Sequence, residues 1–165
     1  MELQKNRESL LRITGRFEGP AAEEETLTLP WSLRQRSRFR TRLDSGGEVG
    51  VFLTRGEVLR DGDRLATGEG RCVRVIAAHE DVAVARSFDH RQLARASYHL
   101  GNRHVPLEIS GDCVRLQPDH VLEEMLRELG LEVRREKSPF QPEPGAYGQA
   151  GSAHAPGHAS PHSHD

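Results

Sequence analysis

The sequence has few of the features that mark secreted, membrane-spanning or nucleic-acid-binding proteins. Its 165 residues include only two cysteines, Cys72 and Cys113, which excludes a disulfide framework and a paired-cysteine metal motif. No apolar run is long enough to span a bilayer, and the N-terminus lacks the apolar core of a signal peptide. The net charge of -2 excludes general affinity for nucleic acid, which requires an excess of Lys and Arg. We therefore expect a cytoplasmic protein with no membrane or nucleic-acid partner.

The chain divides into three parts by composition. Residues 1–78 are rich in turns and strand-like segments, which predicts a small all-β domain. Residues 79–147 predict the order βαββαβ, which is the ferredoxin-like arrangement, with strands at 82–86, 105–109, 113–116 and 131–136. Residues 148–165 contain no large apolar side chain, so they cannot bury a core and predict a disordered tail with histidines. The expected fold class is α+β.

Both helices of the second domain have clear signals. Near residues 89–102, Asp89 is the expected N-cap, and the inward face consists of Leu93, Ala96 and Leu100. Near residues 119–129, Asp119 is the expected N-cap, and the apolar residues expected to face inward are Val121, Leu122, Met125, Leu126 and Leu129. After the last strand, Phe140 and Tyr147 are expected to dock the beginning of the polar segment.

A strip of arginines lies in the first domain, at Arg34, Arg36, Arg38, Arg40 and Arg42. An extended strand would place all five on one face and Phe39, Thr41 and Leu43 on the other. We interpret the strip as a solvent-exposed face or an edge strand protected against aggregation, in preference to a site for an acidic partner.

Histidine is enriched at the C-terminal end, at His154, His158, His162 and His164, which are four of the nine histidines in the chain. Neutral imidazole is a good ligand for nickel, copper and zinc. Pro156, Gly157 and Pro161 prevent a regular helix, so a mobile strand would present the ligands. This arrangement suits capture and release of a metal ion better than a rigid catalytic geometry.

Two further histidines are candidate metal ligands. His99 lies near the end of the first helix, on a flank of the apolar stripe, where the residue pattern alone favours a surface or interface residue over a ligand. A two-fold interface near His99 would change this interpretation, because it would bring the same residue from both subunits together. His120, in the first turn of the second helix, is a secondary candidate.

At residues 98–109, YHLGNRHVPLEI, the sequence resembles the UreE family of urease accessory proteins, which are nickel metallochaperones. The similarity continues through DHVLEEMLRELGL and PFQPEPGAYG, and EVGVFLTRGEVLRDGDRL resembles the family's N-terminal domain. The resemblance implies a homodimer of peptide-binding-like and ferredoxin-like domains that holds Ni(II) between two copies of His99, assisted by the tail histidines. It also implies delivery through a urease accessory GTPase to the apo-urease accessory complex. The chain departs from some relatives in having Gln117 and Pro118 where they carry an additional histidine.

We therefore predict a non-catalytic nickel chaperone for urease. No nucleophile elbow, HExxH pair or phosphate-binding glycine loop is present in the sequence. The alternatives are a general divalent-metal binding or storage protein, since Zn(II) or Cu(II) can also bind imidazole, and a metalloenzyme, which would need an open coordination position beside an acid or base. An RNA-binding module is the third alternative, but aromatic residues make up only 5% and the RNA-stacking motif is absent.

Overall fold

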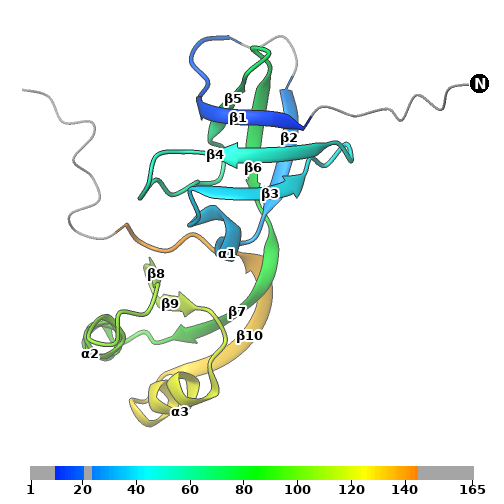
Figure 1. Ribbon diagram of the computed structural model, residues 1–165. Coiled ribbons are helices and arrows are strands. Elements are labelled where there is room, and N and C mark those ends of the chain that lie inside the picture. Colours follow the sequence, from blue (N-terminus) through cyan, green and yellow to red (C-terminus); the bar gives the residue numbers. More distant parts are fainter. Residues whose placement is uncertain (1–9, 21–23, 145–165) are drawn as a thin grey trace, which may run out of the picture.

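The computed structural model describes residues 10–20 and 24–144, which form two β-sheet domains placed end to end (Figure 1). The chain passes between them from β6 (Cys72–Ala77) to β7 (His79–Arg86) across the single residue Ala78. The predicted α+β class, with a β-rich first domain and helices in the second, is confirmed. Among the described residues, no helix is long and apolar enough to cross a membrane.

The first domain is a six-stranded sheet in the order β2-β6-β5-β1-β4-β3. Its other elements are β1 (Leu11–Arg16), β2 (Glu24–Leu29), the one-turn helix α1 (Trp31–Arg34), β3 (Arg38–Arg42), β4 (Glu48–Phe52) and β5 (Arg64–Thr67). Apolar and polar residues alternate along the strands, which places the apolar ones in the core. In β1, Leu11 and Ile13 are buried, whereas Arg12 and Thr14 are exposed. The sequence prediction did not single out β1 and β2, although Leu11 and Ile13 of β1 alternate with polar residues.

The second domain is a four-stranded sheet in the order β10-β7-β9-β8, with antiparallel neighbours throughout. After β7 it contains α2 (His90–Gly101), β8 (Glu108–Ser110), β9 (Cys113–Leu116), α3 (His120–Glu128) and β10 (Glu132–Pro139). The predicted order of six elements is therefore confirmed. The strand predicted to begin at Val105 is shorter and begins at Glu108, because Pro106 has no N–H to donate to a ladder.

Both helices pack on one face of this sheet. The core between them contains Ala83, Ala85 and Val114 from the strands together with Leu100 and Leu126 from the helices. Each helix begins at the predicted N-cap, and Asp119 Oδ1 accepts hydrogen bonds from the backbone N–H groups of Val121 at 2.9 Å and Leu122 at 3.1 Å.

Two details of α3 differ from the predicted inward face. Val121 is 60% exposed, so its predicted inward position is wrong. Glu123 is buried instead and forms an ion pair with Arg135 at 2.8 Å. Counting helical positions alone could not show that β10 brings a guanidinium over this flank of α3.

We expect the substitution Asp119→Ala to lower the free energy of unfolding by about 1 kcal/mol, because two N–H groups of the first turn lose their acceptor. Urea denaturation of the intact chain measures this effect. Asp119→Asn, which keeps an acceptor oxygen, is the control and should retain most of the stability. Equal losses in both variants would show that the side chain acts through its charge and not as a cap.

The two domains share an apolar cluster on the face of the second sheet that the helices leave open. Trp31 from α1 packs with Val82 and Cys113 of the sheet and with Phe140, which follows β10. The Trp31 and Phe140 rings meet edge to face, with centroids 6.2 Å apart. The predicted docking of Phe140 is confirmed, whereas Tyr147 lies outside the described residues.

Arg34 connects the two domains at this junction. Its side chain is fully buried, and Nε donates to the carbonyl of Leu29 at 3.2 Å. Nη1 donates to the carbonyl of Leu59 at 3.4 Å and to Gln141 Oε1 at 2.8 Å, and Nη2 donates to the carbonyl of Phe140. The prediction that Arg34 belongs to an exposed arginine strip is therefore wrong. Local sequence could not reveal this, because its acceptors come from distant segments.

The rest of the strip agrees better with the prediction. Arg38, Arg40 and Arg42 are exposed on β3, while Phe39 and Thr41 between them are half-buried. Since β3 is the last strand of the sheet, the predicted edge position is confirmed.

Candidate metal site

His99 lies in the last turn of α2 and is half-buried. Its main-chain carbonyl accepts a hydrogen bond from Arg103 Nη1 at 2.9 Å, which holds this end of the helix. Its ring contacts the Tyr98 ring edge to face, with centroids 5.4 Å apart and an interplanar angle of 74°. Within the part of the chain that the structure describes, neither imidazole nitrogen of His99 has a hydrogen-bond partner. Either nitrogen is therefore available to bind a metal ion in the appropriate tautomer.

Apolar side chains are exposed on the same domain. Among residues 10–20 and 24–144, the large hydrophobic side chains that are exposed are Val58 in the first domain and Phe88, Tyr98, Ile109 and Val121 in the second. Tyr98, directly beside His99, is 66% exposed. Exposed apolar surface of this kind commonly marks contacts with other proteins. No role was predicted for Tyr98, although a tyrosine on the polar face of α2 was an available signal.

His120 is the first residue of α3 and is exposed. Its side chain has no hydrogen bond or ion pair within the described residues. Across those residues, no three His, Cys, Asp or Glu side chains converge to hold a metal ion, so the structure does not bring His99 and His120 into one complete site. The histidines of the tail, His154, His158, His162 and His164, lie outside the described residues.

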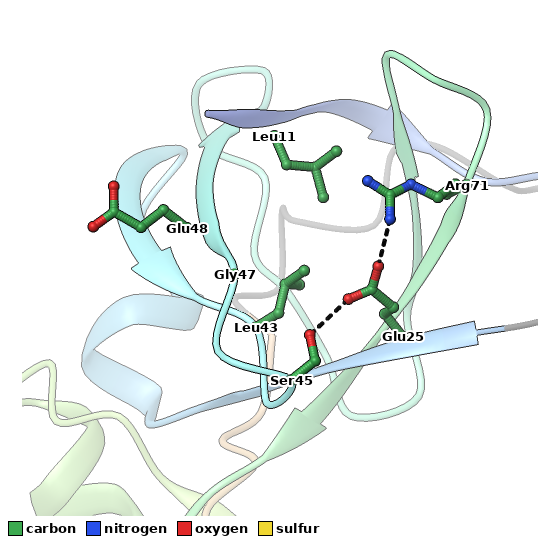
Figure 2. A pocket seen from close by; sticks show the side chains of 7 residues that line it. All are labelled: Leu11, Glu25, Leu43, Ser45, Gly47, Glu48 and Arg71. Carbon is green, nitrogen blue, oxygen red and sulfur yellow. Dashed lines mark hydrogen bonds and ion pairs between the residues drawn. The ribbon is translucent and has the colours of Figure 1, made fainter. Parts of the chain in front are cut away.

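A pocket of about 360 Å³ lies between β1, β2 and the turn that joins β3 to β4 (Figure 2). Leu11 and Leu43 point into it, and Glu25 lies on its wall. The Glu25 carboxylate accepts from Arg71 Nη1 and from Ser45 Oγ, each at 2.8 Å. Because both oxygens of Glu25 are already bonded, this carboxylate is not a free ligand for a metal ion.

A larger cleft of about 820 Å³ lies at the junction of the domains, lined by residues that include Trp31, Val58, His104 and Gln141. His104 adopts a left-handed conformation with φ of 54°, and its backbone N–H donates to the carbonyl of Gly101 at 2.9 Å. This bond fixes the turn from α2 toward β8. Neither His99 nor His120 lines the cleft, so the cleft and the candidate metal ligands are separate features.

Comparison with known proteins gives a consistent result over both domains. Residues 4–78 match the model of the UreE urease accessory protein N-terminal domain, and residues 80–165 match that of its C-terminal domain. The urease accessory protein UreE of Alkalilimnicola ehrlichii is 58% identical over 139 residues, covering 84% of this chain and 85% of the relative. That of Citrobacter koseri is 50% identical over 151 residues, covering 91% and 99%, and that of Escherichia coli O157:H7 is 46% identical over 156 residues, covering 94% and 100%.

These relatives define the class of the protein, which is that of accessory proteins and not of enzymes. The metalloenzyme considered from the sequence is thereby overturned. Within this class, the chain belongs to the UreE family of urease accessory proteins.

Proposed function

We propose that this protein is a nickel metallochaperone, which binds Ni(II) as cargo and delivers it for assembly of the urease metallocentre. Family membership across both domains supports the urease role. The observation that carries the metal-binding role is His99, a half-buried imidazole with both ring nitrogens unpaired within the described residues, next to an exposed tyrosine. Imidazole nitrogen is a suitable ligand for nickel.

The proposed site is shared by two subunits. A single imidazole binds a metal ion weakly, so His99 needs further ligands. In a homodimer with two-fold symmetry, an interface beside α2 would bring two copies of His99 to one ion. The exposed Tyr98 and the other apolar side chains of the second domain support an interface on this domain. The tail histidines His154, His158, His162 and His164 would assist this site and bind further ions more weakly, with His120 as a secondary ligand.

The proposed partners are a urease accessory GTPase and the apo-urease accessory complex, in the cytoplasm. In this proposal, domain 79–147 holds the ion, tail 148–165 gathers it, and domain 1–78 serves contacts with partners. Exchangeable imidazole ligands suit this task, because cargo has to be released again.

Nickel calorimetry together with light scattering tests the proposal, using the intact chain and a chain truncated after Gly148. We expect a dimer in both cases, a tightest site of about one ion per dimer that survives truncation, and loss of the weaker sites with the tail histidines. Absence of nickel binding at micromolar concentration would contradict the chaperone. Displacement of nickel by stoichiometric zinc would instead favour a general divalent-metal protein.

A further inference from the structure

The outer face of the first sheet carries a group of arginines drawn from two strands. Arg38, Arg40 and Arg42 are exposed on β3. The strand register pairs Arg40 with Gly50 of β4, and Gly50 in turn with Arg12 of β1, so Arg12 lies on the same face two strands further in. We call these four residues the arginine face. In Figure 1, β1, β4 and β3 lie side by side in the upper domain.

An aromatic side chain, Phe52 of β4, lies within the arginine face. Phe52 of β4 is paired with Arg38, and the Arg12 guanidinium lies over the Phe52 ring at 4.5 Å from its centroid. A Cβ atom at Gly50 would meet Phe52 Cε2 at 2.8 Å, so only glycine lets the ring lie across the strand. Phe52 is half-buried and packs beneath the Arg12 guanidinium, so this ring holds one cation of the arginine face in place.

The charge of this face is largely uncompensated. Arg42 pairs with Glu48 at 3.0 Å, at one end of the face. In the described part of the chain, no carboxylate lies within ion-pair distance of Arg12, Arg38 or Arg40. A local excess of positive charge therefore lies on a chain whose net charge is -2. Such a field attracts and orients an acidic partner.

The backbone groups of β3 on the side away from β4 are open at the three arginines, whereas just beyond the strand Asp44 N–H donates to Thr26 O of β2 at 3.0 Å. Leu53 N–H donates to Ser37 O at 2.7 Å, and Leu43 N–H donates to Gly47 O at 2.8 Å. Antiparallel ladders alternate, so this register points the backbone groups of Phe39 and Thr41 toward β4 and those of the arginines on β3 toward the open edge. Among the described residues, no strand pairs with that edge.

We propose that β3 and the arginine face bind an extended segment of a partner protein that carries Asp or Glu at every second position. The segment would add to the edge of β3 as a further strand, with its backbone bonded to the open edge. Alternate side chains of a strand project from the same face, so its carboxylates would lie beside the arginines. Protection of the edge against aggregation needs charge only on β3. It does not account for the exposed charge of Arg12 on β1, two strands away.

The test uses three labelled short peptides and fluorescence anisotropy with the intact chain. One peptide alternates Glu with Thr, the second replaces every Glu with Gln, and the third groups the same Glu residues in one block. We expect the alternating peptide to bind about tenfold or more tightly than either of the others, with an affinity that falls as salt rises. Equal binding of the alternating and block peptides would overturn the proposed strand addition.

A pair of charge-reversal variants locates the site. Arg38→Glu combined with Arg40→Glu should lower the affinity for the alternating peptide about tenfold or more, because two contacts become repulsive. The matched control combines Arg91→Glu with Arg95→Glu, both exposed on α2, and should leave binding within about twofold. Equal loss in both double variants would overturn the proposal. Tighter binding of a single-stranded oligonucleotide than of any peptide, lost with Arg38 and Arg40, would overturn it in favour of a nucleic acid.

Discussion

Replacing His99 with alanine is expected to weaken the tightest nickel site of the proposed dimer by more than about 100-fold. One substitution removes a ligand from each subunit, and residues that only orient metal ligands already cost about 10- to 100-fold when they are changed. Nickel calorimetry measures the loss. Light scattering on the same samples shows whether the variant remains dimeric, which separates loss of a ligand from loss of the interface.

The control for this experiment is His90→Ala. His90 is exposed at the other end of α2, so this variant removes an imidazole from the same helix and should leave the tightest site unchanged. If nickel binding survives in His99→Ala and disappears when the chain is truncated after Gly148, the tail alone is the metal site and His99 has a structural role.

Replacing Arg34 with alanine is expected to lower the free energy of unfolding by about 4 kcal/mol, because several buried acceptors lose their donor at once. These acceptors are the carbonyls of Leu29, Leu59 and Phe140 and the side chain of Gln141. The substitution also leaves a cavity beside Trp31. Urea denaturation, followed by Trp31 fluorescence and by circular dichroism, measures the loss and shows whether the two domains still unfold together.

Two opposing effects act on the charged form of Arg34 at the junction, namely burial and nearby carboxylates. Burial lowers the pKa of the guanidinium from its ordinary value, and the carboxylates of Glu80, Asp61, Asp63 and Glu108 oppose that shift. Arg34→Lys keeps the charge but lacks the planar fork, so it should recover only part of the stability. Arg36→Ala, exposed two residues away, should change stability by less than about 0.5 kcal/mol. Equal effects of Arg34→Ala and Arg36→Ala would contradict the role of Arg34 at the junction.

The sequence predicted those parts of the fold whose signals are local. The caps Asp89 and Asp119 and the stripe formed by Leu93, Ala96 and Leu100 identified α2 and α3 correctly, because capping and helical periodicity act within a few residues. Arg34 was misplaced for the opposite reason. Its alternation with the following arginines suggested a strand, whereas a short helix begins at Trp31, after the N-cap Pro30, and buried carbonyls from both domains surround the side chain.

The candidate metal site was predicted in part. His99 was singled out from the family resemblance and from the two-fold argument, since its position alone favoured a surface or interface residue, and it is half-buried with no hydrogen bond to either ring nitrogen within the described residues. Its contact with Tyr98 and the exposure of Val121 could not be read from periodicity, because both depend on how much of each helix the sheet covers. The metal-binding role of His99 stays a prediction, as do the roles of the tail histidines.

The single residue between the two sheets has a consequence for how cargo would be presented. Ala78 is bonded through its N–H to the carbonyl of Leu29, β7 begins at the next residue, and the buried contacts of Trp31 and Arg34 join the two domains, which together limit rotation of one domain on the other. A partner seated on the edge of β3 would meet an ion held on α2 at one distance and from one direction. The junction would then fix the position of the partner relative to the ion, so that the protein would orient the transfer as well as supply the ion.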